Sequence, residues 1–227
     1  MSLPNTELDL AVLDRRAINQ TLQKATAGTF TVANPGGAHA LACGLMHPVE
    51  VTIAGHCGYY AAGMNQEASV VIEGNAGTGV AENMISGQVR VTGNASQSAG
   101  ATGHGGLLVI EGDTSARCGI SMKGIDIVVG GSVGHMSAFM AQAGRLVVCG
   151  DAGADLGDSI YEAELFVQGA VASLGADCEE KEMTDQHREA LKDLLSRAGL
   201  DADPAGFRRY GSARTLYNFN IDNMDAY

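Results

Sequence analysis

The sequence contains no tryptophan and only 4 prolines, and aromatic residues make up 5% of its 227 positions. A core with so few rings must be built from valine, isoleucine, leucine and alanine, which favours thin, regular stacking over a bulky globule. Glycine is abundant, at 31 residues, and 45% of the chain is hydrophobic, so the composition is not that of a disordered protein. The length is sufficient for a sizeable core.

Basic residues are also scarce, with 14 Lys and Arg against 26 Asp and Glu and a net charge of −12. No long run of Lys or Arg provides the clustered basic face that nucleic-acid binding requires, which argues against such a partner. No segment approaches the ~20 apolar residues that span a bilayer, and the start, MSLPNTELDLAVLDRR, has no signal-type pattern. Five cysteines cannot all pair within one chain, which favours free thiols in a reducing cytosol. We therefore expect a cytoplasmic protein without membrane contact.

Seven apolar runs that each end in glycine recur along the chain: VTIAG, VVIEG, VRVTG, LVIEG, IVVGG, LVVCG and LFVQG. Their last residues are Gly55, Gly74, Gly93, Gly112, Gly131, Gly150 and Gly169, so every interval is 19 residues. A register kept through six intervals without insertion or deletion indicates a structural repeat.

Within each run, two apolar columns alternate with a mixed one. The first column holds Val51, Val70, Val89, Leu108, Ile127, Leu146 and Leu165, and the second holds Ile53, Ile72, Val91, Ile110, Val129, Val148 and Val167. Between them lie Thr52, Val71, Arg90, Val109, Val128, Val147 and Phe166. Period-two alternation predicts a short strand with one apolar face in every repeat.

Turn residues and very small residues also keep the register. The glycine is followed by Asn, Asp or Ser in most repeats, and these residues bond their own backbone and suit a sharp corner. Seven positions past the glycine every residue is small: Ala62, Ala81, Gly100, Gly119, Ala138, Gly157 and Ala176. We expect that no larger side chain fits there.

A 19-residue unit of this kind can bury its apolar face only by stacking on copies of itself. The sequence therefore predicts an all-β fold, a right-handed parallel β-helix of about seven to eight coils. Stepping back 19 residues from Gly55 and Val51 reaches Gly36 and Val32 in FTVANPGG, which predicts one degraded coil upstream.

The open ends of such a solenoid need caps. We expect an N-terminal cap over residues 1–27, the repeat domain over 28–178, a helix within 179–200 and a C-terminal tail over 201–227. Residues 8–23 are predicted to form a helix with Leu10, Leu13 and Ala17 near one face. A second helix is predicted over 184–198, with Thr184 as N-cap, a stripe of Leu191, Leu194, Leu195 and Ala198, and a stop at Gly199.

The tail differs in composition from the rest of the chain. It contains Phe207, Tyr210, Tyr217, Phe219 and Tyr227, together with Arg208, Arg209 and Arg214. Aromatic residues with arginine are typical of interface hot spots, but they could also pack against the rod itself. Both alternatives stay open from the sequence.

No catalytic, cofactor-binding or metal-binding residue is predicted in this chain. GNAGTG at 74–79 and GDAGADLG at 150–157 superficially fit phosphate-binding loops, but each is followed by the next repeat instead of a helix. The cysteines form no CxxC pair, no two histidines share a column on adjacent coils, and no GxSxG, HExxH or Ser-His-Asp grouping is present.

Repeats such as VVIEGNAG and LVVCGDAG resemble the GXGXG domain that closes the large subunit of glutamate synthase, over roughly residues 28–178. The tail segment RRYGSARTLYNFNID looks like that of the stand-alone subunit of the N-methylglutamate synthase family. Ser96 and Ser115 stand where the motif would place glycine.

This resemblance implies a right-handed β-helix with a scaffolding role and no catalytic residue of its own. The implied partners are a class II glutamine amidotransferase-like subunit and a synthase-like subunit that carries FMN and an iron–sulfur cluster. In such a hetero-oligomer the β-helix chain helps to shape an internal passage for ammonia or methylamine. The alternatives are a subunit of a formylmethanofuran-dehydrogenase-type complex and a β-helix enzyme acting on polysaccharide. The last would need a carboxylate pair that the repeat does not show.

Overall fold

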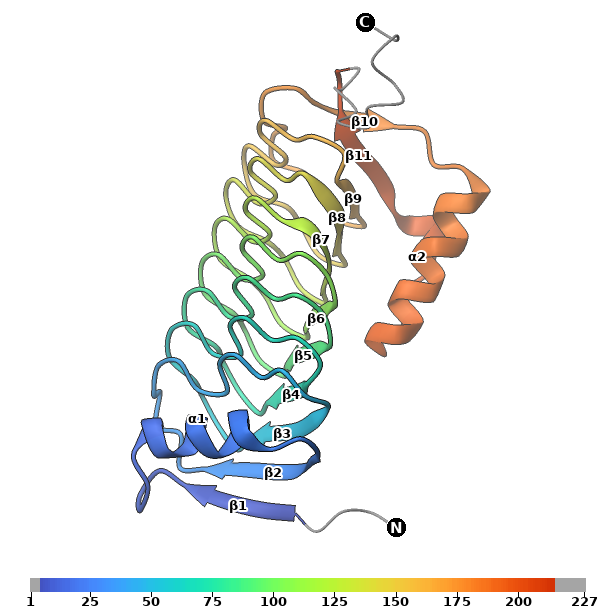
Figure 1. Ribbon diagram of the computed structural model, residues 1–227. Coiled ribbons are helices and arrows are strands. Elements are labelled where there is room, and N and C mark those ends of the chain that lie inside the picture. The colour runs from blue at the N-terminus through green and yellow to red at the C-terminus, as the bar shows by residue number, and fades with distance from the viewer. Residues whose placement is uncertain (1–4, 215–227) are drawn as a thin grey trace, which may run out of the picture.

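Parallel strands stack along the long axis of the molecule into one continuous sheet (Figure 1). The computed structural model describes residues 5–214. The parallel strands are β1 (Asn5–Asp9), β2 (Gly28–Ala33), β3 (Val49–Ile53), β4 (Ser69–Ile72), β5 (Gln88–Val91), β6 (Leu107–Ile110), β7 (Lys123–Val129), β8 (Ala143–Val148) and β9 (Glu164–Val167). The remaining elements are the helices α1 (Arg15–Lys24) and α2 (Asp185–Ala198), the 3-10 turn η1 (Pro204–Gly206), and the strands β10 (Cys178–Lys181) and β11 (Arg208–Ser212). β11 lies antiparallel between β9 and β10.

From β3 to β9 each strand pairs with the next in the predicted 19-residue register, as Val51 with Val70 and Leu146 with Leu165. A second, shorter parallel ladder runs along another side of the coils, for example from Cys57 to Ala76 and Ala95. The predicted fold class, an all-β parallel β-helix with two short helices, is confirmed, but α2 lies beside the rod and does not cap its end.

Both predicted apolar columns point into the rod and are buried along its length. Side chains at these positions are 0–2% exposed from Val51 to Val167. The interior is therefore a continuous stack of aliphatic side chains, as the near absence of aromatic residues suggested.

The column of small residues is explained by backbone conformation together with burial. Its members from Ala62 to Gly157 all have a left-handed φ, between 54° and 68°, and all are buried. A large side chain would be both strained and without space at such a position. The prediction is confirmed for these six coils and is wrong for Ala176, which is exposed.

The corner residues bond the next coil, which corrects the expectation that they bond their own backbone. Asn75 Oδ1 accepts a hydrogen bond from the backbone N–H of Asn94, 2.8 Å away, and Asn94 Oδ1 accepts one from Asp113. The same contact repeats through Asp113, Ser132 and Asp151 and begins at His56 Nδ1, which accepts from Asn75 N–H. These six bonds form a side-chain ladder along one edge of the rod.

This ladder also accounts for the repeated glycine. A Cβ at Gly112 would overlap Asn94 Oδ1, and a Cβ at Gly131 would overlap Asp113 Oδ1. Each corner side chain thus occupies the space beside the glycine of the following coil, and the two columns depend on each other.

The N-terminal cap differs from its prediction. The helix begins at Arg15 and not at residue 8, because the Asp14 side chain accepts from Ala17 N–H and caps it. Residues 5–9 form β1 instead, since the free edge of β2 offers them a parallel partner. Ile18 and Leu22 are the buried residues of α1, whereas Leu13 is exposed.

The 19-residue step fails at both ends of the repeat. The predicted upstream coil exists as β2, but Val32 pairs with Ile53 and not with Val51, a step of 21 residues. Downstream, Ala152 pairs with Val171 at a step of 19, but Leu156 pairs with Leu174 at a step of 18. Because this last step is one residue shorter, Ala176 no longer aligns with the column of small residues.

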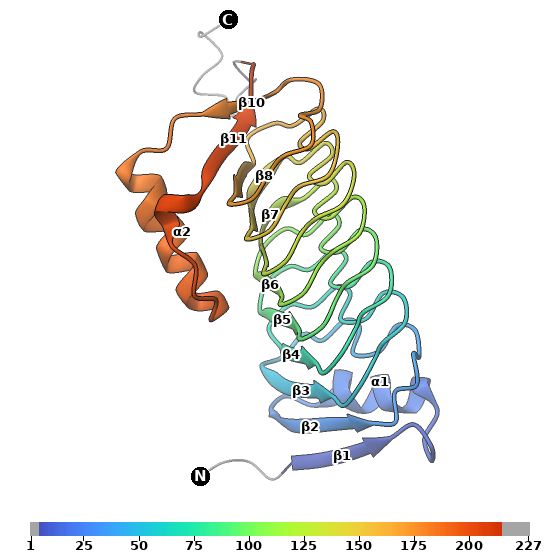
Figure 2. The same cartoon turned by 180° about the vertical axis from the view of Figure 1, so that it is seen from behind.

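Helix α2 confirms its predicted cap, stripe and stop, with Thr184 as N-cap and Gly199 at a left-handed φ of 65°. The helix lies beside the rod (Figures 1 and 2). Its leucines pack on the outer face of the sheet over β6 to β9. There they form a second core with Val109, Val128, Val147 and Phe166, the last four members of the mixed column. Neither helix in the described part of the chain is long and apolar enough to cross a membrane.

Candidate functional surfaces

The glycine turn at 150–157 has its backbone groups occupied by neighbouring coils. Asp151 N–H donates to Ser132 Oγ at 3.0 Å, and Asp151 Oδ1 accepts from Ala170 N–H at 2.7 Å. The N–H groups of Ala152 and Gly153 donate to carbonyls of the coils on either side. A phosphate loop would need such groups free at the start of a helix, and here the chain continues into β9.

Nucleophilic and metal-binding groups are dispersed. Within residues 5–214 no three His, Cys, Asp or Glu side chains come together in a way that could hold a metal ion. All five cysteines are free, and burial raises the pKa of Cys57 and of Cys118 to about 12. Such thiols are poor nucleophiles near neutral pH.

An ion-pair network joins α2 and β11 to the outer face of the sheet. Arg145 forms a two-pronged pair with Asp126 on the adjacent strand, with Nε–Oδ1 at 2.8 Å and Nη2–Oδ2 at 2.6 Å. This carboxylate raises the pKa of Arg145. Arg209 of β11 and His187 of α2 both approach Glu164, at 2.9 and 3.3 Å. The network fixes the C-terminal elements on the rod.

Arg90 marks the end of the covered part of the sheet. Its Nη2 donates to the carbonyl of Ala198 at the C-terminus of α2, 2.5 Å away, and its Nη1 pairs with Glu111 at 2.7 Å. A cation at a helix C-terminus is favourable because it meets unpaired carbonyls and the negative end of the helix dipole. Sequence patterns did not single out this role.

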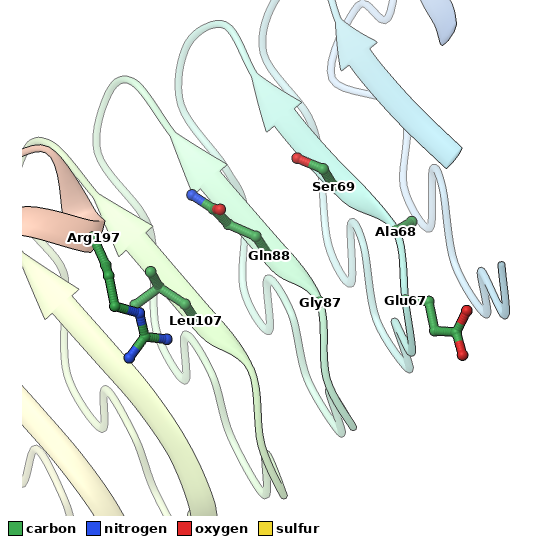
Figure 3. A pocket seen from close by; sticks show the side chains of 7 residues that line it. All are labelled: Glu67, Ala68, Ser69, Gly87, Gln88, Leu107 and Arg197. Atoms are coloured by element: carbon green, nitrogen blue, oxygen red, sulfur yellow. The ribbon is translucent and has the colours of Figure 1, made fainter. Parts of the chain in front are cut away.

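Beyond Arg90 the outer face of the sheet is open, and a shallow groove of about 400 Å³ lies beside the end of α2 (Figure 3). Ser69 and Gln88 project from adjacent strands, Leu107 lies deeper, and Arg197 reaches over from α2. The charged residues of the lining are Glu67 and Arg197, and Arg197 pairs with Asp193 and Asp126.

The first half of the tail shows the self-packing alternative. Phe207 and Tyr210 are buried, and Phe207 belongs to the second core, so residues 201–214 pack on the rod. Tyr217, Phe219 and Tyr227 lie outside the described residues. Partner contact through them stays a prediction, as does the expected absence of catalytic and cofactor-binding residues.

The fold and these surfaces define a capped parallel β-helix protein with a filled interior. Over 225 residues the chain is 59% identical to Protein GlxC of Rhizobium meliloti (strain 1021), covering 97% of this chain and 99% of that protein. The chain therefore belongs to the GlxC family. No family model matches it, so the likeness to the GXGXG domain rests on the quoted repeats alone.

Proposed function

We propose that this chain is a non-catalytic scaffolding subunit of a glutamate-synthase-like complex, specifically N-methylglutamate synthase (methylamine–glutamate N-methyltransferase). The observation that carries the proposal is the use of the glycine turns. Their polar groups form hydrogen bonds with neighbouring coils. The groups that could contact another molecule therefore lie on the outer surface of the rod. Support also comes from the likeness of the repeats and of RRYGSARTLYNFNID to the stand-alone subunit, and from membership of the GlxC family.

In this proposal the partners are a class II glutamine amidotransferase-like subunit and an FMN-binding synthase-like subunit that also carries an iron–sulfur cluster. The complex is a cytoplasmic hetero-oligomer, and this chain binds no cofactor. Because aliphatic side chains fill the interior from Val51 to Val167, an amine or ammonia passage cannot run through the rod. The chain would supply an outer wall to such a passage, for which the open sheet face beyond Arg90 is the available surface.

Co-expression of the tagged full chain with the two partner genes tests this function. We expect all three chains to purify together with a flavin spectrum, and N-methylglutamate formation from methylamine to require this chain. Val148→Asp, which places a charge in the rod interior, should abolish assembly, while Asp151→Asn should not. Purification from native cells without an amidotransferase-like or flavin-binding chain would refute the proposal. Co-purification with a molybdenum or tungsten subunit would instead favour the formylmethanofuran-dehydrogenase-type alternative.

A further inference from the structure

Helix α1 presents unpaired cations to solvent at the N-terminal end of the rod. Arg15, Arg16 and Lys24 are exposed, and within residues 5–214 none of them has an acidic group within 4 Å. By contrast, every arginine from Arg145 to Arg214 is in an ion pair. A cluster of unpaired cations is unusual in a chain of net charge −12.

At their position, these arginines do not stabilise helix α1. Arg15 and Arg16 are the first two residues of α1, and its first turn contains no acidic residue. The helix dipole disfavours cations at that end. Helix stability alone would select acidic residues there, so the arginines indicate another use.

The polar side of α1 that faces the rod is occupied by capping bonds. Asn19 Nδ2 donates to the carbonyl of Ala40 at 2.7 Å and Gln23 Nε2 donates to that of Cys43 at 2.8 Å. The outer side borders an open groove of about 510 Å³ whose lining contains no carboxylate: Arg15, Arg16, Asn19, Gln20, Gln23 and Ala40. The N-cap Asp14 is the acidic residue nearest in the chain, and its side chain is bonded to Ala17 N–H.

Exposed aromatic and methionine side chains lie on the coil that follows Ala40, a lining residue of this groove. Tyr59, Tyr60 and Met64 are 52%, 49% and 54% exposed. Ala40 connects them to α1, because its carbonyl accepts from Asn19 and its N–H donates to the carbonyl of Tyr59 at 2.6 Å. The tyrosines therefore lie one coil along the rod from the arginines, and the Glu82 carboxylate lies near Tyr60 on the side away from α1.

The aromatic side chains are held in place before any partner binds. His39 stacks on Tyr59 with ring centroids 4.5 Å apart, and Tyr59 meets Tyr60 edge to face at 6.5 Å. His39 Nδ1 accepts from Tyr59 N–H, and Arg15 Nη1 donates to the His39 carbonyl. Ordered tyrosine and arginine side chains are typical of interface hot spots, since little rotamer entropy is lost on binding.

We propose that this surface, defined by Arg15, Arg16, Gln20, Tyr59, Tyr60 and Met64 and called the N-terminal face, binds an acidic segment of a partner protein chain. Carboxylates of that segment pair with the arginines, and an apolar side chain contacts the two tyrosines. A protein segment fits better than nucleic acid, because two arginines cannot offset the repulsion of a polyanion by a chain of charge −12. The inference does not depend on which complex contains the chain.

The test places a photo-crosslinking amino acid at Tyr60 of the full chain in its native cells and identifies the adduct by mass spectrometry. We expect one protein partner whose crosslinked peptide is net acidic. Arg15→Glu with Arg16→Glu should reduce that adduct at least tenfold. Lys123→Glu with Lys192→Glu, an equal charge change at exposed and unpaired lysines elsewhere, should leave it within about twofold.

Thermal unfolding serves as the control that the variants are correctly folded. The Arg15/Arg16 double variant should keep its midpoint, because acidic residues suit a helix N-terminus. Absence of an adduct at Tyr60, an adduct with a second copy of this chain, a non-acidic peptide or insensitivity to the arginine reversal would overturn the proposal. An acidic partner unrelated to glutamate-synthase-like subunits would support the N-terminal face and refute the proposed complex.

Discussion

Replacing Gly112 by alanine should destabilise the protein mainly through the side chain of Asn94 on the preceding coil. The new methyl group would overlap Asn94 Oδ1, which accepts from Asp113 N–H at 2.8 Å, and would lie 2.9 Å from the Gly93 carbonyl oxygen. Asn94 must then rotate away, which loses a hydrogen bond worth about 1 kcal/mol and adds rotamer strain of about 1 kcal/mol. Adjustment of the backbone contact adds about 1 kcal/mol by bond-angle distortion, so Gly112→Ala should cost about 3 kcal/mol.

A double-mutant cycle separates these contributions. Asn94→Ala alone loses the hydrogen bond, at about 1 kcal/mol, and the double variant keeps only that loss and the backbone adjustment, about 2 kcal/mol together. The double variant should therefore be about 2 kcal/mol more stable than the sum of the single effects. The smaller conformational entropy of unfolded alanine enters both Gly112 variants and cancels.

Urea unfolding followed by far-ultraviolet circular dichroism measures each free energy, provided that the slope against urea is unchanged between variants. Gly211→Ala is the matched control, because its Cβ would meet its nearest atoms at 3.7–3.8 Å and its φ is not left-handed. That variant should change stability by less than about 0.5 kcal/mol. Additivity of Asn94→Ala and Gly112→Ala within about 0.5 kcal/mol would refute the mutual dependence of the glycine and ladder columns.

Three further predictions concern the same rod. Val148→Asp would bury an unpaired charge at a position that is 0% exposed, and should therefore prevent folding. The loss would be measured as the amount of soluble protein and as the β-strand signal in circular dichroism. A folded variant would contradict the inward placement of Val148. Asp151→Asn should keep the unfolding free energy within about 0.5 kcal/mol, because Asn75 and Asn94 accept the same bond elsewhere; a larger loss would mean that the charge itself matters. Cys57 and Cys118, whose pKa of about 12 leaves almost no thiolate at pH 8, should resist a disulfide reagent until denaturant is added, and rapid labelling of both in the folded protein would disprove their burial.

The repeat could be predicted because every coil uses the same residue types at the positions that pack against the neighbouring coils. The inward columns, the corner and the small column recur at positions that stacking holds identical, so the 19-residue interval carries over directly into strand register. The upstream coil was misplaced by two residues because its loop to β3 is longer, and no repeated residue there reveals the extra length.

The N-terminal cap was mispredicted for a different reason. Leu10 and Leu13 fit a helical period, but residues 5–9 gain backbone hydrogen bonds by pairing with β2, and such tertiary pairing overrides a local pattern. The role of the corner side chains was misassigned because their partners are 19 residues away. A local turn and an intercoil ladder require the same Asn and Asp, so the pattern does not distinguish them.

The residues of the mixed column could have been used to predict where α2 packs on the sheet. From Val109 to Phe166 its members are all apolar although they point out of the rod, whereas two of the three earlier members, Thr52 and Arg90 but not Val71, are polar. Outward apolar residues on consecutive coils require a cover, and the leucine stripe at 191–198 is the apolar surface of matching length in the chain. The reversal from Arg90 to Val109 marks the coil where this cover ends, and Arg90 itself caps the helix there.

The same constraints determine where partner recognition can reside. Inward positions, left-handed small positions and the corner ladder are each restricted by the neighbouring coil, so a substitution there changes stability before it changes a surface. Outward positions have no such restriction, and the 19-residue register holds them at fixed spacing along the rod. Three outward regions differ clearly in chemistry: the part covered by α2, the open polar sheet beyond Arg90, and the N-terminal face with its arginines and tyrosines. A rigid rod with chemically distinct regions at set distances suits the proposed scaffolding function, in which two different partners are held in a defined relative position.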